Sequence, residues 1–210
     1  MGEGCYSAMF KTSVESHFLQ KKKNYHHGEL RAALIDAALV ILKDRGMEHL
    51  SLRVLARATQ VTVTAPYSHF RDKDDLLAAI AETGFQRLAL QMAEDATRLK
   101  DTRQRIEKLM VSYIRFAAEN KQLFRLMFSR ELSDMKRYPT LAMTAGKSYA
   151  LMSAALSGRE DTGFLTVVIW SLCHGLTTLI IDDKINLEQF GAAQVDDFIK
   201  RTVGVFTERF

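Results

Sequence analysis

Proline and cysteine are scarce in this sequence, with two of each among 210 residues. Cys5 and Cys173 are far apart in the chain, so the sequence has neither a disulfide framework nor cysteine spacing typical of a metal site. This cysteine usage fits a reduced, cytoplasmic location best. Residues 1–23 contain no continuous apolar core of signal-peptide length. The scarcity of proline permits long helices throughout the chain.

The sequence also lacks the patterns on which common enzyme sites are built. It has no Gly-rich phosphate loop, no metal-ligand spacing, and no paired carboxylates or nucleophile–base arrangement. Cys173 and His174 are adjacent, so on a helix they diverge and do not form a catalytic pair. His26 and His27 diverge by about 100° on a helix, which makes a poor metal site. The sequence therefore predicts no enzyme activity, no metal and no cofactor.

Charge is distributed unevenly along a chain whose composition is otherwise ordinary for a globular protein. The formal net charge is +4, and residues 1–71 hold ten Lys and Arg against six Asp and Glu. Residues 72–210 hold 19 of each sign. A positive excess confined to one part of a chain is typical of a surface that meets nucleic acid. Four charges are a weak signal, so the sequence motif that follows carries more weight.

Residues 51–77 have the sequence SLRVLARATQVTVTAPYSHFRDKDDLL. Ser51 is expected to cap a short helix, because its hydroxyl can accept from an otherwise unpaired backbone N–H. The buried side of that helix is expected to hold Leu52, Leu55 and Ala56. The following residues, Thr59-Gln60-Val61, are too polar and too β-branched to continue it comfortably.

A second short helix, about Thr62 to His69, is expected after this turn. Thr62 is predicted to cap it, and Pro66 falls near the end of its first turn, where proline is tolerated. Asp72 with Asp75 resembles the capping box of a third, long helix. Two short helices crossing over a tight turn are the pattern of a helix-turn-helix, in which the second helix lies in the DNA major groove.

The side chains of the second helix fit that role. Short hydroxyls can reach phosphates or bases, small apolar groups can touch a thymine methyl, and tyrosine and histidine can donate to phosphate oxygens. A lysine in the first turn of the next helix is natural if a phosphate sits there. The DNA contacts predicted in this region are Arg53, Thr62, Val63, Thr64, Ala65, Tyr67, Ser68, His69 and Lys73.

The run from Val61 to Phe70, followed by Lys73 and Leu76-Leu77, closely resembles the TetR family of bacterial transcriptional repressors. In that family the Tyr-x-His-Phe run and the lysine after it hold the DNA backbone. Residues 25–31 and the pattern Trp170-x-x-x-His174-Gly175 resemble one branch, named for a Trp-His-Gly type C-terminal half. The resemblance implies an all-α fold, with an N-terminal three-helix DNA-binding domain and a C-terminal helical bundle for ligand binding and dimerisation.

The turn departs from the family pattern, because Thr59-Gln60 stands where the family usually has Ala-Gly. If the second position requires a positive φ, glutamine adopts it at a cost of roughly 1 kcal/mol or more. The turn would then differ slightly from that of its relatives.

Three domains are expected from the motif, the resemblance and the composition. Residues 1–23 are predicted to be a flexible basic arm, residues 24–71 the helix-turn-helix DNA-binding domain, and residues 72–210 the ligand-binding and dimerisation domain. Lys21, Lys22 and Lys23 are predicted to follow the DNA backbone or enter the minor groove. A solvated, solubilising tail is an equally good interpretation of this arm.

The spacing of apolar residues predicts helices over most of the C-terminal part. They are expected at about 24–45, 72–99, 102–119, 120–128, 140–156, 162–181 and 191–208, with a loop over 130–139 that ends at Pro139. Residues 162–181 contain no formal charge and are long enough for a membrane span. Their many small and polar residues favour a buried helix of a bundle, so no membrane association is predicted.

Methionine and aromatic residues in these helices could line an adaptable ligand cavity, since Met fills irregular gaps. The predicted ligand-binding residues are Met110, Tyr113, Phe116, Phe124, Met127, Phe128, Tyr149, Met152, Trp170 and His174. For any single one of these residues, plain core packing is the simpler interpretation. His174 in particular is either a pocket residue or a core or interface residue. Trp170 and His174, four apart, should stack on one helix face.

The last two helices are more apolar than one subunit readily covers, and in the family they pair across a two-fold axis. The sequence therefore predicts a cytoplasmic homodimeric repressor that binds a palindromic double-stranded DNA operator and is released by an unknown small-molecule effector. The alternative is a TetR-like architectural or division-linked DNA-binding protein without an inducer.

Overall fold

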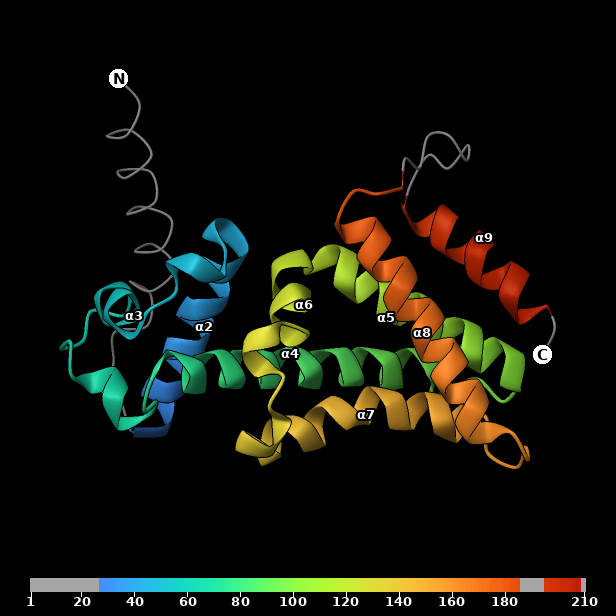
Figure 1. The fold of residues 1–210 in the computed structure, drawn as a ribbon, viewed down its shortest axis with the longest axis horizontal. Helices are drawn as coiled ribbons and strands as arrows, with labels where there is room; N and C mark the ends of the chain where they lie inside the picture. Colours follow the sequence, from blue (N-terminus) through green and yellow to red (C-terminus); the bar gives the residue numbers. More distant parts are fainter. Residues whose placement is uncertain (1–26, 186–194, 209–210) are drawn as a thin grey trace, which may run out of the picture. The chain divides into compact units, whose positions relative to one another are not determined.

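The computed structural model describes residues 27–185 and 195–208, and all regular structure within these ranges is helical (Figure 1). The α-helices are α2 (His27–Arg45), α3 (Leu52–Ala58), α4 (Lys73–Ala96), α5 (Thr102–Glu119), α6 (Lys121–Met127), α7 (Pro139–Ala155), α8 (Thr162–Ile181) and α9 (Val195–Thr207). Short 3-10 helices are η1 (Met47–His49), η2 (Ala65–Ser68), η3 (Arg130–Leu132) and η4 (Met135–Arg137). The expected all-α fold is confirmed.

The chain divides into two compact units. The N-terminal unit runs to Ile80 and also includes Ser129–Ser133, whereas the C-terminal unit holds Ala81–Phe128 and the residues from Asp134 onward. α4 contributes to both units, because the boundary falls within it. The inclusion of Ser129–Ser133 in the N-terminal unit, with Leu132 buried at 1% exposure, has no counterpart in the sequence pattern.

The N-terminal unit is built as the sequence predicts at the end of its first helix and the start of its second, whereas the predicted helix start at 24 lies outside the described residues. α2 ends at Arg45 and is followed by Gly46, which has a φ of 89° and donates its N–H to Leu42 O at 3.0 Å. Ser51 caps α3 by accepting from Val54 N at 3.2 Å. The core of the unit is aliphatic and includes Leu34, Ala37, Ala38, Ile41, Leu42, Leu50, Leu52, Leu55, Ala56, Leu76, Leu77 and Ile80.

The turn after α3 requires a left-handed residue, and Gln60 supplies it with a φ of 58°. Val61 N donates to Ala56 O at 3.0 Å and Gln60 N to Arg57 O at 3.2 Å. These two bonds define a Schellman motif, in which glycine usually occupies the position of Gln60. The conditional prediction of a positive φ is confirmed, and the cost of placing a glutamine there is roughly 1 kcal/mol or more.

The second helix of the predicted motif is shorter than expected. Residues from Thr62 to His69 do not form one helix, because η2 covers only Ala65–Ser68 and carries the i to i+3 bonds of a 3-10 turn. The prediction that Thr62 caps it was wrong: Thr64 precedes η2, with no side-chain cap. Three β-branched residues before Pro66 explain the difference, since they disfavour an α-helical first turn.

The cap of α4 is half of the predicted capping box. Asp72 Oδ1 accepts from Asp75 N at 2.8 Å, as expected. The Asp75 carboxylate instead accepts from the backbone N–H of Arg71 at 3.1 Å and from the Arg71 guanidinium at 2.6 and 2.5 Å. This two-pronged ion pair fixes the chain that enters α4.

The C-terminal unit is organised around α5, whose neighbours in the unit are α6, α7, α8 and α9 (Figure 1). The predicted bounds of α5 and α8 match the structure to the residue. Pro139 was predicted to end a loop but is the first residue of α7, where its missing N–H is harmless. The expected loop before it contains η3 and η4. The predicted start of the last helix, at 191, lies outside the described residues.

α8 is, within the described ranges, the helix that is long and apolar enough to cross a membrane by length and composition. One stripe of it is buried: Thr166, Ile169, Cys173, Thr177, Ile180 and Ile181. Its neighbours are α5 and α7. The stripe therefore belongs to the core of the bundle, as the polar and small residues in α8 predict.

Gly84 allows α4 and α6 to approach closely within the C-terminal unit. A Cβ atom at Gly84 would lie 2.6 Å from Met127 Sδ and 3.1 Å from Leu123 Cδ1. Gly146 in α7 is the opposite case, since a Cβ there would meet nothing within 4 Å.

The two glycines therefore predict opposite effects of alanine on stability. Gly146→Ala should raise the free energy of unfolding by about 1 kcal/mol, the gain in helix propensity. Gly84→Ala should lower it by about 1 kcal/mol, because overpacking against Met127 outweighs the same gain. Urea unfolding of both variants measures the difference. Equal stabilisation by both would show that the contact between α4 and α6 is not tight.

Candidate functional site

The N-terminal unit exposes the side chains that the sequence singled out around η2. We call Thr62, Val63, Thr64, Tyr67 and Ser68 the hydroxyl surface; all five are exposed. Tyr67 is 51% exposed and Val63 48%. The neighbouring Ala65 and His69 are half-buried. This surface therefore presents hydroxyl groups together with the exposed apolar side chain of Val63.

Buried residues on the other side of η2 hold the hydroxyl surface in place. Pro66 is buried, Phe70 is 2% exposed, and the Arg31 guanidinium lies 5.5 Å from the centre of the Phe70 ring. Ser68 Oγ donates to Ala65 O at 2.7 Å, and the hydroxyls of Thr62 and Thr64 lie 3.2 Å apart. These bonds orient the short hydroxyls before any ligand arrives, which lowers the entropy cost of binding.

Positive charge borders the hydroxyl surface. Arg53, Arg57 and Lys73 are exposed, whereas the Arg71 guanidinium is engaged by Asp75. The N–H group of Asp75 is already satisfied by Asp72, so it is not available to an anion at the start of α4, where the exposed Lys73 ammonium supplies positive charge. The remaining predicted contacts, Lys21, Lys22 and Lys23, lie outside the described residues.

An acidic group that the sequence did not point to lies near Lys73. The pKa of Glu131, in η3, is lowered by a hydrogen bond from its own backbone and by one from Ser129, and further by the positive charges of Lys73 and Arg130. Glu131 therefore adds a negative charge to the N-terminal unit on the side of Lys73. η3 lies more than 50 positions after Lys73 in the sequence, and the fold places it in the N-terminal unit.

In the C-terminal unit, six of the predicted ligand-binding residues form a connected group of rings, the aromatic cluster: Tyr113, Phe124, Phe128, Tyr149, Trp170 and His174. Phe128 and His174 have ring centres 4.5 Å apart, and those of Phe124 and Phe128 are 4.8 Å apart. Trp170 and His174 lie 5.9 Å apart at 32°, which confirms the predicted stacking along α8.

A hydrogen bond ties α5 to α8 at the centre of this cluster. Tyr113 Oη lies 3.1 Å from His174 Nδ1. Burial raises the pKa of Tyr113 far above its ordinary value, so its hydroxyl keeps its proton. Burial also lowers the pKa of His174, which favours the neutral ring. The hydrogen bond between Tyr113 and His174 therefore joins two neutral groups, a phenol and an imidazole.

Most of the predicted ligand-binding residues are buried in the C-terminal unit. Met110, Phe116, Met127 and Met152 are at most 3% exposed, as are Tyr113 and Phe124. The cluster reaches solvent at one edge, where Phe128 is 36% exposed and Tyr149, Trp170 and His174 are half-buried. None of the ten residues lines the groove between α4 and α7 or the groove of α8 and α9.

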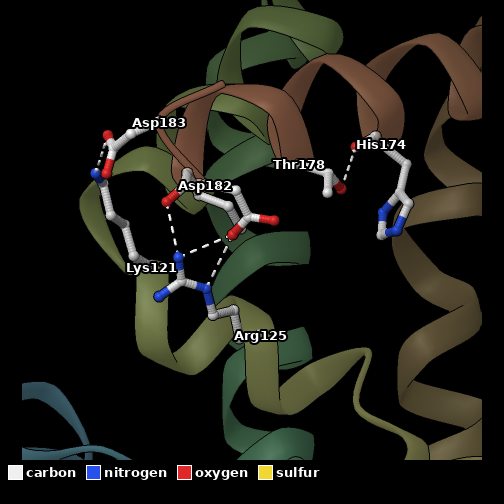
Figure 2. A network of polar contacts seen from close by, with 7 residues as sticks. Lys121, Arg125, His174, Thr178, Asp182 and Asp183 are labelled. Atoms are coloured by element: carbon white, nitrogen blue, oxygen red, sulfur yellow. Dashed lines mark hydrogen bonds and ion pairs between the residues drawn. The ribbon is translucent and has the colours of Figure 1, made fainter. Parts of the chain in front are cut away.

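A polar network fastens α6 to the end of α8 (Figure 2). Arg125 Nη2 donates to Ile181 O and to Asp182 Oδ1, both at 2.8 Å, and Lys121 Nζ lies 3.3 Å from Asp183 Oδ1. Arg125 thus satisfies a carbonyl that the end of α8 leaves unpaired.

Sequence reasoning missed this network, although its two halves were visible. Lys121 and Arg125 are four apart on one helix, and two aspartates follow the uncharged stretch of α8. Nothing in the sequence says that these two ends meet. Their meeting matters for the cluster, because α6 carries Phe124 and is followed directly by Phe128, and α8 carries Trp170 and His174.

Two family models match this chain. Residues 34–80 match the model described as bacterial regulatory proteins, tetR family. Residues 106–206 match the model described as tetracyclin repressor-like, C-terminal domain. The first covers α3, the hydroxyl surface and the start of α4, and the second covers most of the C-terminal unit.

Similar proteins and structures are found as well. The chain is 23% identical over 162 residues to an uncharacterized HTH-type transcriptional regulator, YobS, of Bacillus subtilis (strain 168), covering 77% of this chain and 84% of that protein. A protein of unknown function from Rhodococcus sp. RHA1 has a TM-score of 0.77 at 28% identity, covering 90% of this chain and 99% of that one. The transcriptional regulator FadR from Bacillus subtilis, in complex with stearoyl-CoA, has a TM-score of 0.61 at 15% identity, covering 82% and 96%, and shares the fold.

Loss of the Arg125 side chain should loosen α6 from α8. Arg125→Ala is expected to lower the free energy of unfolding by about 1–2 kcal/mol, because a charged donor is removed from a carbonyl and a carboxylate. Arg103→Ala, at an exposed arginine of α5, is the matched control and should change little. Chemical unfolding measures both. Similar values for the two variants would mean that the network is not stabilising.

The lowered pKa of His174 predicts that the protein is less stable in acid. In the unfolded chain His174 binds a proton near pH 6.5, whereas in the folded protein its pKa is lower. The free energy of unfolding is therefore unaffected by His174 above about pH 6.5 and decreases as the pH falls below that value. His174→Gln should remove this part of the pH dependence, and His49→Gln, at an exposed histidine, should not. Urea unfolding from pH 7.5 to 5 tests it. An unchanged pH profile in the His174 variant contradicts the assignment.

Proposed function

The chain belongs to the tetR family of bacterial regulatory proteins, and we propose that it is a cytoplasmic repressor that binds a palindromic operator as a homodimer and leaves it when a small-molecule effector binds. The membership confirms the family resemblance, and the Trp-His-Gly branch stays a prediction. The observation that carries the proposal is the hydroxyl surface, held outward by a buried Pro66 and Phe70 and bordered by positive charge.

The chemistry of this surface suits a DNA backbone and groove. Hydroxyls of threonine, serine and tyrosine hydrogen-bond phosphates without adding charge, whereas Lys73 and the exposed Arg53 add electrostatic attraction. Val63, with 48% of its surface exposed, offers an apolar contact to a thymine methyl. Because η2 is only four residues long, the contacting groups come from the turn at Thr62–Thr64 as much as from the helix.

A homodimer would place two such surfaces on one face of DNA, about 34 Å apart or at a wider spacing. We propose that the dimer forms through α8 and α9, where an apolar groove of about 520 Å³ opens to solvent. Phe164 and Val205 in its lining are each 71% exposed. Covering these apolar side chains in an interface would remove apolar surface from water, which is favourable. A two-fold interface buries the same patch on both subunits, so one surface explains the whole contact.

The effector is proposed to bind at the aromatic cluster, by moving Phe128 and the half-buried rings at its edge. FadR from Bacillus subtilis binds stearoyl-CoA, and an acyl effector is therefore one class to screen for this chain. An effector acts only through its difference in affinity for the two arrangements of the protein. The network between α6 and α8 holds the cluster in one of these arrangements.

The packing of the cluster also favours a second candidate function. Its central residues Tyr113 and Phe124 are at most 2% exposed and pack as plain core, which is what an effector-free architectural DNA-binding protein would show. Mapping of binding sites across the genome separates the two. One or a few promoters favour the repressor, and many scattered sites favour the architectural protein.

The role proposed for Lys73 predicts a change in salt dependence. Lys73→Gln should weaken binding to a duplex from upstream of the protein's own gene and reduce the slope of log K against log salt by about 1, because one phosphate contact is lost. Lys184→Gln, which removes an exposed lysine near the end of α8, is the control with an unchanged slope. A Lys73 variant that keeps the original slope would contradict a phosphate contact.

The proposed interface predicts that a charge on α8 or α9 separates the subunits. Phe164→Asp and Val205→Asp should each shift the protein from dimer to monomer, since a carboxylate would be buried unpaired in the seam. Met143→Asp changes a residue of similar exposure, 66%, on α7 and should leave the dimer intact. Sedimentation velocity gives the masses. If Phe164→Asp and Val205→Asp remain dimers and Met143→Asp becomes a monomer, the interface does not lie on α8 and α9.

A further inference from the structure

A second groove lies between α4 and α7, on the surface of the C-terminal unit. Its volume is about 540 Å³, within the range of small-molecule sites. It shares no lining residue with the aromatic cluster or with the groove of α8 and α9. Among its lining residues are Gln86, Leu90 and Ala93 from α4 and Lys147, Ala150 and Leu151 from α7.

The floor of this groove is aliphatic and shallow. Alanines on both helices leave space, and Leu90 is 62% exposed although it is a large apolar side chain. Covering Leu90 and the alanine methyl groups with an aliphatic chain removes apolar surface from water on both partners. The groove therefore favours a ligand whose body is a flexible hydrocarbon chain.

The charge of the groove is restricted to one residue. α7 spans 17 residues and Lys147 is the charged one among them. Lys147 lines the groove, and the residues found to line it include no acid. The Gln86 amide, which donates to Glu82 Oε1 at 3.3 Å, is the other polar group in the lining. A lysine stem lies well along apolar surface while its ammonium stays in water, where it can meet an anionic head group.

We propose that the groove between α4 and α7 is a binding site for an amphipathic monocarboxylate, with its hydrocarbon chain on Leu90 and the alanines and its carboxylate at Lys147. One positive charge on an aliphatic floor complements one negative charge on an aliphatic chain. The assignment does not depend on DNA binding, and it is separate from the effector site proposed at the aromatic cluster.

The full-length protein, with its alanine methyl groups labelled with carbon-13, is titrated with decanoate below the concentration at which decanoate forms micelles. Saturable shifts are expected at Ala93 and Ala150. Trp170 is the single tryptophan and lies in the aromatic cluster, so its fluorescence should stay unchanged. Shifts that are absent, or decanoate binding that changes Trp170 emission and leaves Ala93 and Ala150 unaffected, would overturn the proposal.

Variants separate the two parts of the ligand. Lys147→Gln should weaken decanoate binding about two- to fivefold, as expected for one exposed ion pair, and leave decanol binding unchanged. Ala150→Leu, at an exposed position that tolerates a larger side chain, should fill the groove and abolish binding of both. Lys200→Gln, at an exposed lysine of α9, is the matched control.

Three outcomes would overturn the assignment. The first is equal decanoate affinity for the Lys147 variant and the wild-type protein. The second is unchanged affinity in Ala150→Leu, which would place the ligand elsewhere. The third is dissociation of the dimer by Ala150→Leu in sedimentation velocity, which would make the groove an interface between copies of the chain.

Discussion

One helix, α4, has to satisfy two separate cores. Leu76, Leu77 and Ile80 are buried within the N-terminal unit, and the apolar stripe continues with Phe85 and further residues buried in the C-terminal unit. One apolar stripe can face both cores because α4 is a continuous helix from Lys73 to Ala96. The side chains of α6 that pack against Gly84 therefore contact the same helix that begins, at Lys73, beside the hydroxyl surface.

The hydroxyl surface depends on strain and caps more than on regular helix. Gln60 accepts an unfavourable φ so that the chain can turn after α3, and Pro66 with Phe70 anchors the other side of η2. Both features leave Thr62–Thr64 outside any helix, with side chains exposed. Residues held in costly conformations often mark functional positions, and here the costly turn directly precedes the proposed DNA contacts.

Two helices could be predicted from the sequence to the residue. The apolar residues of α5 recur at helical spacing because one face is buried, and α8 coincides with an uncharged run of 20 residues. η2 could not, since three β-branched residues and Pro66 compete with a helix pattern that the family resemblance favoured. The proposed DNA contacts follow from local motifs and were predictable. Three features bring together segments that are far apart in the sequence: the Arg125 network, Glu131 near Lys73, and the groove between α4 and α7. Local sequence patterns do not show which distant segments come into contact.

The most direct test of the account is a titration of the full-length protein with a duplex from upstream of its own gene, followed by backbone amide NMR in dilute salt. The account predicts that the largest shifts fall between Thr62 and Lys73, with smaller ones at Arg53 and Arg57. Shifts that avoid this segment, or a spectrum that the duplex leaves unchanged, would contradict the assignment of this surface to DNA.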